Sequence, residues 1–279
     1  MEKTFVISLE REKRLFISRT SEVETSLFRY PGGKFKVADQ IVCHLELISR
    51  SGLVEPFCGG ASVAIRYAKR NQDATILLND LNPRTFVFWT ELVSNYESLA
   101  NDIFEYRPTV ESFFEMKKLD SALSSIVVNR CSHSGRGGGP IGGKDQSGKW
   151  KIGARWNGVA LSREILSLGK LLSGRCFVTC RDGISMIAEK GEGFALYADP
   201  PYVSAGKSLY EMHFSHDDHA RLRDCLENSG GWVLSYDNHD CVRSSFDGMG
   251  GVSMKYIEVN AAKHSGGSQK QTEVLYVKP

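Results

Sequence analysis

The sequence lacks the features that mark several classes of protein. Its 7 cysteines include no C-x-x-C pair, and the closest two, Cys176 and Cys180, have no second pair or His-x-x-x-His partner, so we predict no metal site. An odd number of cysteines in a chain of 279 residues favours free thiols in a reducing cytoplasm. No apolar run reaches the roughly 18 residues that a membrane-spanning helix needs, and residues 1–25 lack the apolar core of a signal peptide. We therefore expect a soluble, cytoplasmic protein without membrane contact.

An excess of charge of one sign is also missing from the chain as a whole. The 35 basic and 33 acidic side chains leave a formal net charge of +2, which argues against a polybasic tail. The charge is unevenly distributed, because residues 121–175 contain nine basic and two acidic side chains, a net charge of +7, so the rest of the chain carries −5. The nine basic residues are Arg130, Arg136, Lys144, Lys149, Lys151, Arg155, Arg163, Lys170 and Arg175. Because nucleic-acid affinity depends on where the charge lies, this segment is the candidate surface for such a partner.

Two common nucleotide-binding fingerprints are absent too. The pair Gly59-Gly60 is followed by Ala61-Ser62-Val63, which does not complete a G-x-G-x-x-G fingerprint, so a nicotinamide or flavin enzyme is not favoured. Residues 30–34 lack the G-x-x-x-x-G-K-S/T spacing of a P-loop. What the chain does have is glycine between a strand and a helix, which lets the backbone approach a ligand closely.

The order of the predicted elements is typical of a doubly wound α/β fold. A short strand at residues 53–54 precedes the glycine loop, a helix over 61–70 follows, and a strand over 74–78 ends in an acidic loop. The later strands are expected at residues 176–180, 194–198, 232–236, 253–259 and 273–277. Strands that alternate with helices in this way indicate a largely parallel sheet.

The middle of the chain interrupts this alternation. Residues 86–128 are predicted to be largely helical, and residues 135–158 hold nine glycines, a density that argues against a continuous helix. Residues 1–28 have short alternating apolar stretches and no evident chemistry. We therefore divide the chain into an N-terminal extension (1–28), an α/β domain in two parts (29–90 and 176–279) and an insertion (91–175).

The most specific motif, Asp199-Pro200-Pro201-Tyr202, follows the strand at 194–198. Two consecutive prolines supply no N–H to a sheet and fix the loop at the carboxyl end of the strand, where open α/β sheets bind their ligands. The Asp199 carboxylate and the Pro200 carbonyl can each accept a hydrogen bond from an amine, and the Tyr202 ring offers a stacking face. This arrangement suits a planar ring with an exocyclic NH₂ group. The alternative is a turn in which Asp199 is a cap and Tyr202 packs in the core.

Two further polar positions accompany the glycine loop. Asp80 follows the second strand, where a carboxylate binds ribose hydroxyls in this topology, or it caps the helix that begins near Pro83. Lys34, beside two glycines, can bind a carboxylate or a phosphate, or it can belong to an ordinary turn before a helix. Neither position is specific alone, so their order along the chain is what makes them informative.

In this order, the motifs resemble those of the Dam-like, D12-class DNA adenine-N6 methyltransferases, over residues 27–279. The segments that carry the resemblance are Tyr30-Pro31-Gly32-Gly33-Lys34, Val54-Glu55-Pro56-Phe57-Cys58-Gly59-Gly60, Asn79-Asp80-Leu81-Asn82, Asn129-Arg130 with the glycine-rich segment to Arg155-Trp156-Asn157, Asp199-Pro200-Pro201-Tyr202, Leu234-Ser235-Tyr236-Asp237 and Glu273-Val274-Leu275. It implies a Rossmann-like doubly wound methyltransferase sheet. It also implies an inserted, mostly helical and loop-rich domain that recognises the DNA target.

The resemblance implies S-adenosylmethionine as the methyl donor. The residues that it assigns to this cofactor are Tyr30, Lys34, Phe57, Gly59, Gly60, Asp80 and Asp182. Phe57 and the glycines would line the methionine and sulfonium end, and Asp80 would hold the ribose hydroxyls. Gly183 stands where the family has an aromatic residue, and the residues after Asn129-Arg130 depart from the pattern of GATC-specific enzymes.

For catalysis, the resemblance assigns Asp199, Pro200 and Tyr202. The adenine would be flipped out of the duplex, because its amine cannot be reached inside it. Asp199 and the Pro200 carbonyl would then bind the two N6 hydrogens, and Tyr202 would stack on the ring. Direct attack on the methyl group would follow, with no metal and no covalent enzyme intermediate.

Double-stranded DNA is the implied partner, and the protein is expected to be a monomer or a weak dimer. The residues assigned to DNA contact are Lys34, Arg130, Arg136, Lys144, Lys149 and Arg155. The arginines are candidates for base contacts, because Arg commonly reads guanine. The alternative for each basic side chain is a solvated surface. Two other functions stay open: a non-catalytic DNA-binding relative, and a methyltransferase acting on RNA or on a protein amide.

Overall fold

The computed structural model describes residues 27–29, 33–135, 137–189, 193–203, 214–262 and 268–279. The alternating stretches of residues 1–26 lie outside these ranges. No helix within the described ranges is long and apolar enough to cross a lipid bilayer.

One seven-stranded sheet organises the described chain, in the order β3-β2-β1-β4-β5-β7-β6. Its strands are β1 (Gly52–Glu55), β2 (Thr75–Asn79), β3 (Cys176–Thr179), β4 (Ala195–Ala198), β5 (Trp232–Asp237), β6 (Ser253–Ala262) and β7 (Ser268–Lys278). The first five strands are parallel, and β7 lies antiparallel between β5 and β6. All residues of β1, β4 and β5 are buried, as expected for parallel strands covered on both faces. The strand order reverses between β1 and β4, so the connections after these strands diverge and leave a crevice.

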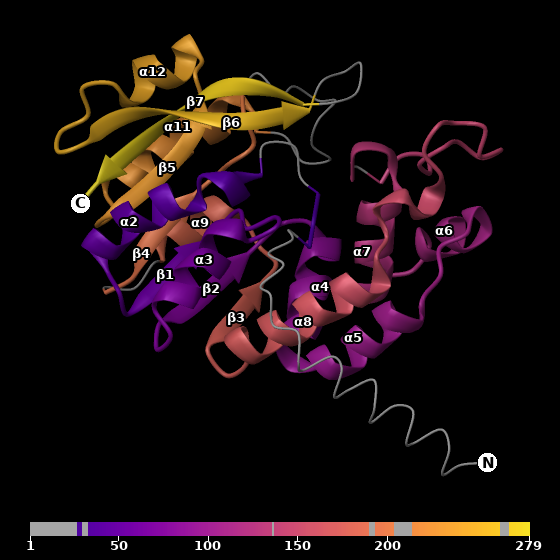
Figure 1. Cartoon of the computed structure of the whole chain (residues 1–279). Coiled ribbons are helices and arrows are strands. Elements are labelled where there is room, and N and C mark those ends of the chain that lie inside the picture. The colour runs from indigo at the N-terminus through magenta and orange to yellow at the C-terminus, as the bar shows by residue number, and fades with distance from the viewer. Residues whose placement is uncertain (1–26, 30–32, 136, 190–192, 204–213, 263–267) are drawn as a thin grey trace.

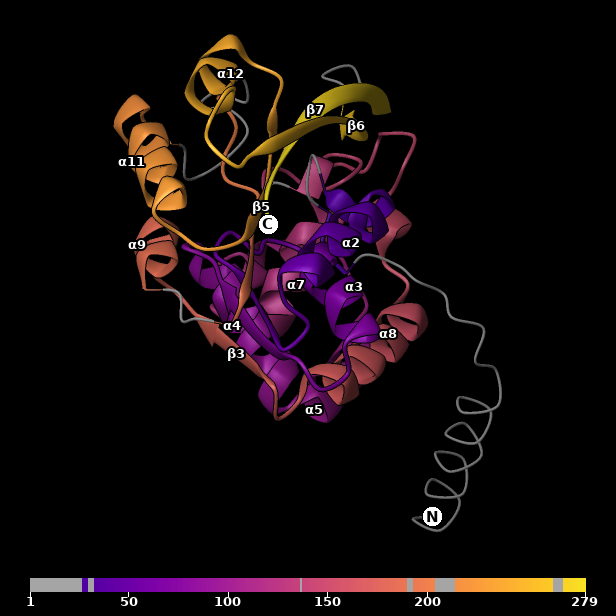
Figure 2. The same cartoon turned by 90° about the vertical axis from the view of Figure 1, so that its left-hand side faces the viewer.

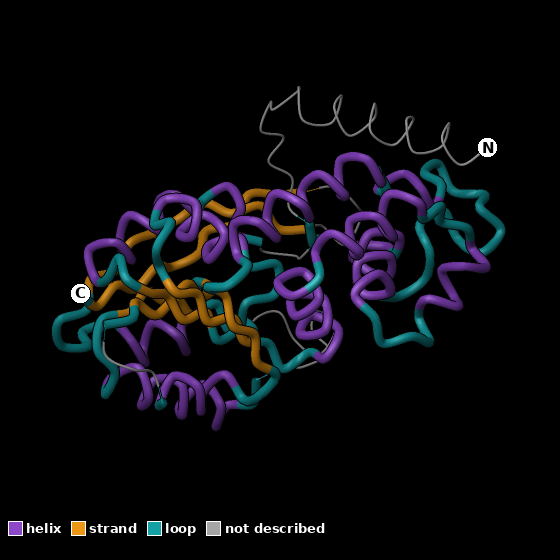
Figure 3. Tube along the Cα trace, turned by 90° about the horizontal axis from the view of Figure 1, so that it is seen from below, coloured by secondary structure: helices purple, strands orange, loops and turns teal. Residues whose placement is uncertain are grey.

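Helices cover both faces of the sheet, as Figures 2 and 3 show. The 3₁₀ turn η1 (Lys34–Lys36) leads into α2 (Ala38–Ile48), and α2 and α3 (Ser62–Arg70) pack on one face. On the other face lie α9 (Gly183–Ala188), α11 (His216–Glu227) and α12 (Asp240–Phe246). Each face has its own apolar core, with Ile41 and Tyr67 in the first and Leu222 and Phe246 in the second. The predicted doubly wound α/β sheet is therefore confirmed.

The chain between β2 and β3 forms a helical group to one side of the sheet (Figure 1). It contains α4 (Pro83–Ser94), α5 (Tyr96–Glu105), α6 (Val110–Met116), α7 (Ala122–Cys131), η2 (His133–Gly135), η3 (Ile152–Arg155) and α8 (Gly158–Leu172). Apolar side chains of α5 and α8 join the main core, whereas a separate small cluster that includes Phe113 and Ile152 stabilises the outer part. The helices α5 and α8 approach closely, since a Cβ on Gly169 would lie 2.0 Å from Cγ of Tyr96. The helices and the glycine-rich loop are as predicted, and recognition of DNA by this segment stays a prediction.

Candidate active site

A cleft of about 580 Å³ opens at the carboxyl ends of β1, β2 and β4, where the strand order reverses. The predicted cofactor and catalytic residues that line it are Lys34, Phe57, Gly59, Gly60, Asp80, Asp182 and Asp199. The first and last of these residues are 165 positions apart in the sequence, and the sheet brings them to one edge. Two predicted site residues, Tyr30 and Arg136, lie outside the described residues.

Asp80 fixes the glycine loop from the tip of β2. Its Oδ2 accepts a hydrogen bond from the backbone N–H of Gly59 at 2.8 Å, and its Oδ1 accepts one from the N–H of Asn82 at 2.9 Å. Gly59 has a φ of 44°, in the left-handed region that glycine adopts without strain. Burial raises the pKa of Asp80, although the two N–H groups oppose the rise. Because a carboxylate offers about four acceptor positions, Asp80 retains capacity for ligand hydroxyl groups.

Asn79, the last residue of β2, ties together the loops that follow three strands. Its amide N–H₂ group donates to the carbonyls of Pro56 and Arg181, both at 2.9 Å. Its Oδ1 accepts from the Thr179 hydroxyl at 2.8 Å and from the Arg181 N–H at 3.1 Å. A buried amide with all these partners rigidifies the base of the cleft. The sequence placed Asn79 in the acidic loop but did not predict this role.

The Asp199 carboxylate, directly after β4, is held by three side chains. Lys34 Nζ lies 2.8 Å from both of its oxygens. The hydroxyl groups of Ser235 and Tyr202 donate to Oδ1 at 2.8 and 2.9 Å, and the Tyr197 hydroxyl bonds Ser235 in turn. Within the described chain, Oδ2 accepts from Lys34 alone. The carboxylate is therefore oriented by its neighbours while one oxygen keeps acceptor capacity for a ligand in the cleft.

A second carboxylate, Glu273 of β7, lies behind this group and was not predicted as a site residue. Its Oε2 is 3.3 Å from Lys34 Nζ and 2.8 Å from the Tyr202 hydroxyl, and its side chain is 1% exposed. Burial raises the pKa of Glu273 to about 7, against the opposing charge of Lys34, and the charge of Asp199 adds to the rise. Burial also disfavours the charge of Lys34, but the two carboxylates outweigh it and raise the pKa of Lys34. In the sequence, the signal for Glu273 was one acidic residue directly before the apolar run of β7.

The three residues that follow Asp199 in the motif after β4 lie in different surroundings. Pro201 lines the cleft beside Asp199, whereas Pro200 is buried. The Tyr202 hydroxyl accepts a hydrogen bond from Lys34 at 2.6 Å, and neither Tyr202 nor Pro200 is among the described residues that line the cleft. Contacts of Pro200 and Tyr202 with a base stay predictions.

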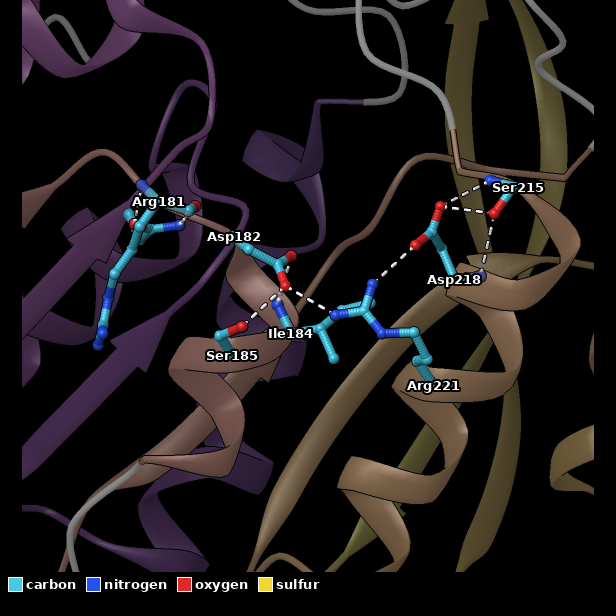
Figure 4. Close-up of polar contacts among 8 residues, drawn as sticks. Arg181, Asp182, Ile184, Ser185, Ser215, Asp218 and Arg221 are labelled. Carbon is cyan, nitrogen blue, oxygen red and sulfur yellow. Dashed lines mark hydrogen bonds and ion pairs between the residues drawn. The ribbon is translucent and has the colours of Figure 1, made fainter.

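Asp182 has a local structural role in addition to its place in the cleft wall (Figure 4). It caps α9, because its Oδ1 accepts from the Ile184 N–H at 3.3 Å and its Oδ2 accepts from the Ser185 hydroxyl at 2.9 Å. Arg221 of α11 donates to the same Oδ2 at 3.0 Å and pairs with Asp218, also at 3.0 Å. Burial opposes the charged form, but these hydrogen bonds and the Arg221 charge lower the pKa of Asp182. Arg221 thus links the first turn of α9 to the first turn of its own helix, α11.

The packing around Gly183 leaves no room for a side chain. A Cβ on Gly183 would lie 2.5 Å from Cε1 of Phe57 and 2.8 Å from the Pro56 carbonyl oxygen. The Phe57 ring fills this space and packs edge-on against Phe214, with ring centroids 5.5 Å apart. An aromatic residue at position 183 does not fit here, and Phe57 and Phe214 are among the aromatic residues that line the cleft.

Three arginines, Arg29, Arg130 and Arg155, crowd the cleft. Burial and the charge of Arg29 lower the pKa of Arg130 to about 10. Burial and the charge of Arg155 lower the pKa of Arg29. Asn129 holds the backbone of Arg29 in place. Its Oδ1 accepts from the Arg29 N–H at 2.7 Å, and its Nδ2 donates to the Arg29 carbonyl at 3.1 Å. Among the residues assigned to DNA contact, the cleft contains Lys34, Arg130 and Arg155, and the exposed glycine-rich loop contains Lys144 and Lys149.

Comparison with known proteins gives matches in sequence and in structure. Residues 30–131 match the family model of the D12 class N6 adenine-specific DNA methyltransferases. The chain is 26% identical over 231 residues to the DNA N-6-adenine-methyltransferase of Escherichia phage P1; the match covers 76% of this chain and 29% of that protein, so the chain spans less than a third of this relative.

Among solved structures, precorrin-6y C5,15-methyltransferase from Geobacter metallireducens is 10% identical at a TM-score of 0.42, over 87% of this chain and 86% of that one. An O-methyltransferase from Bacillus cereus is 10% identical at a TM-score of 0.38, over 97% of this chain and 90% of that one. The match over residues 30–131 includes the lysine, the glycine loop and the acidic loop that meet in the cleft. The resemblance predicted from the sequence is therefore confirmed over residues 30–131, which match the family model of the D12 class N6 adenine-specific DNA methyltransferases.

Proposed function

We propose that this protein transfers a methyl group from S-adenosylmethionine to N6 of an adenine flipped out of duplex DNA. The observation that carries the proposal is the Asp199 carboxylate, which Lys34 orients at the tip of β4 in the wall of the cleft. The family match of residues 30–131 and the similarity to the phage P1 enzyme support DNA adenine as the acceptor.

The residues around the cleft fit the methyl donor. S-adenosylmethionine supplies a methyl group bound to a positively charged sulfur. Asp80 would accept its ribose hydroxyls, Phe57 would cover an apolar face, and Asp182 would lie near its adenine. Gly59 and Gly60 let the backbone approach the ligand, and the volume of about 580 Å³ lies in the range of small-molecule pockets. Tyr30 and Lys34 would contact the methionine end.

The chemistry of this chain consists in binding and orienting the adenine amine. Asp199 would accept a hydrogen bond from one N6–H group, and the Pro200 carbonyl would accept one from the other. These two contacts localise the nitrogen lone pair, which is otherwise delocalised into the ring, and aim it at the methyl group. The bond from N6 to the methyl carbon would form as the carbon–sulfur bond breaks, and the methylated amine would lose one proton to solvent. Lys34 keeps the carboxylate in one orientation, and positioning of this kind supplies a large part of many rate accelerations. Tyr202 would stack on the flipped base, a contact of about 1–3 kcal/mol.

The insertion of residues 91–175 would hold the DNA. Lys144 and Lys149 are exposed on its glycine-rich loop, where they would neutralise phosphates, and Arg130 and Arg155 would face the strand that enters the cleft. If both lysines contact phosphates, the double variant Lys144→Gln, Lys149→Gln lowers the slope of log affinity against log salt by about 2. Lys278 pairs with the first residue of β5 at the end of the sheet away from the cleft, so Lys278→Gln should leave the slope unchanged. An unchanged slope in the double variant would exclude the loop from the DNA-binding surface.

Substitution of Asp199 tests the catalytic proposal. Asp199→Asn keeps the size of the side chain but replaces one acceptor oxygen by an N–H₂ donor, so methyl transfer to duplex DNA should fall at least about 100-fold, as when one preorganised polar contact is removed from an active site. Binding of S-adenosylmethionine, measured by calorimetry, should persist. Asp240→Asn is the matched control, because the Asp240 side chain is 94% exposed on α12.

Full activity of Asp199→Asn in a tritiated-methyl assay would refute the proposed mechanism. The assay needs three acceptors, namely duplex DNA, RNA and protein, because transfer to RNA or protein alone would replace the proposed substrate. Sequencing of modified bases in DNA from cells that express the protein would then give the methylated base and the recognition sequence together.

A further inference from the structure

One ammonium and two carboxylates form a largely buried cluster at the wall of the cleft. Lys34 and Glu273 are 3% and 1% exposed, while Asp199 is 23% exposed. Lys34 Nζ contacts both carboxylates, and the Tyr202 hydroxyl lies within 2.9 Å of each. A hydroxyl carries one proton, so Tyr202 donates to one carboxylate at a time. The cluster therefore has room for one further proton between Asp199 and Glu273.

In the described part of the chain, Glu273 pairs with one cation, Lys34, and its other titratable neighbours include Asp199 and Tyr197. Its neighbours across the sheet are Asp237 of β5 and Ile257 of β6. The Asp237 carboxylate accepts from the Val203 N–H at 3.3 Å. With both carboxylates ionised, the group of Lys34, Asp199 and Glu273 has a net charge of −1 in a place where uncompensated charge is costly. Glu55 of β1, a third buried carboxyl group near Lys34 and Asp199, adds no charge to this count, because burial raises its pKa well above the ordinary value.

We propose that Glu273 is the counter-charge for a cationic ligand of the cleft: it holds a proton when no positive charge is bound, and it releases this proton when the methyl donor binds. The inference rests on the proposed function. Lys34 and Asp199 line the cleft and contact Glu273 or its hydrogen-bond partner, so they connect it electrostatically to the ligand. One added positive charge makes the cluster neutral with both carboxylates ionised.

The proton on Glu273 would also make the affinity for the methyl donor differ from the affinity for the demethylated product. The sulfur of S-adenosylmethionine is positively charged, whereas that of S-adenosylhomocysteine is neutral. Glu273 would take up a proton from solvent once the positive charge has left the cleft, and the product would lack an attraction that the donor experiences. Because proton release and binding are linked, a higher pH must strengthen donor binding relative to product binding. The burial that brings the pKa of Glu273 to about 7 places this effect near neutral pH.

Calorimetric binding tests the inference without requiring turnover. Both ligands are titrated at pH 7 in two buffers of different ionisation enthalpy, and their affinities are measured at pH 6 and pH 8. The wild-type protein should release about half a proton more than Glu273→Gln does on binding S-adenosylmethionine. Its preference for S-adenosylmethionine over S-adenosylhomocysteine should rise about tenfold from pH 6 to pH 8 relative to Glu273→Gln. The comparison with Glu273→Gln removes the titration of the ligand's own amino group.

Two further variants make the result decisive. Glu115→Gln, on the exposed surface of α6, should behave as the wild type. Tyr202→Phe removes a hydrogen bond that lowers the pKa of Glu273, so proton release should move to higher pH. An unchanged affinity for S-adenosylhomocysteine would show that Glu273→Gln is folded. If that variant does not fold, the pH at which Tyr202→Phe releases the proton still tests the inference, and an unshifted pH would contradict it.

Two outcomes would overturn the inference alone. One is equal proton release with both ligands, which would mean that occupancy rather than charge is sensed. The other is Glu273→Gln retaining the pH-dependent preference of the wild type. If neither ligand binds the wild-type protein at any pH, the proposed function is wrong and this inference is wrong with it.

Discussion

Replacement of Glu273 by glutamine should stabilise the protein, and the gain should grow with pH. The introduced glutamine side chain has the size of protonated glutamic acid but cannot ionise. Burial raises the pKa of Glu273 from the ordinary 4.5 to about 7, although Lys34 opposes the rise. Between these two values the folded protein keeps a proton that the unfolded chain has lost, so the stability of the wild type falls as pH rises.

The magnitude follows from the interval between the two pKa values. Each pH unit between 4.5 and about 7 corresponds to about 1.4 kcal/mol, so ionisation of Glu273 costs the wild type about 3 kcal/mol by pH 8. Below pH 4.5 the carboxyl group is protonated in both states, and the two proteins should differ little from this source. The difference in unfolding free energy should therefore rise by about 3 kcal/mol from pH 4.5 to pH 8.

Urea unfolding followed by circular dichroism at pH 5, 6, 7 and 8 measures this difference. Glu115→Gln, which removes an exposed glutamate, is the control and should show a nearly constant difference from the wild type. A constant difference for Glu273→Gln as well would mean that Glu273 has an ordinary pKa. The charge argument for the buried cluster would then fail.

Two other substitutions test the packing at the cleft wall. Gly183→Ala places a Cβ within 2.5 Å of a carbon of the Phe57 ring, so the unfolding free energy should fall by about 1–3 kcal/mol in urea titrations. The control is Gly250→Ala, whose Cβ meets nothing within 4 Å and which should change the unfolding free energy by no more than about 0.5 kcal/mol. Equal effects of the two substitutions would contradict the clash at position 183. Arg221→Ala breaks an ion pair of half-exposed side chains with Asp182 and should cost less than about 1 kcal/mol by the same assay, whereas a larger loss would show that this link holds α9 and α11 in place.

Local pattern was sufficient to predict the elements that build the site. The apolar runs at residues 53–54 and 194–198 became β1 and β4, and the polar motif after each became part of the cleft wall. The reason is that parallel strands end at the same edge of the sheet, so residues that follow strands converge whatever their distance in sequence. Lys34 was predicted from its place beside two glycines, and it does reach Asp199.

The sequence alone did not predict the contacts between side chains from distant segments. Glu273 and Asn79 were visible within motifs, but their roles depend on burial and on partners that only the packed sheet brings within hydrogen-bond distance. Gly183 departs from the family pattern, and only the packed structure places the Phe57 ring in the space that a side chain at this position would occupy. Such packing depends on the relative placement of loops, which no local preference specifies.

The sequence by itself determined the α/β alternation, the order of the motifs and the concentration of positive charge in residues 121–175. These follow from periodicity, turn chemistry and composition, which act over short stretches of chain. The tertiary structure alone decided that Lys34 is shared by two carboxylates, that Arg130 lies in the cleft, and that Glu273 is buried beside them. Charge and burial act through space, so the electrostatic character of the site was fixed only when the strands came together.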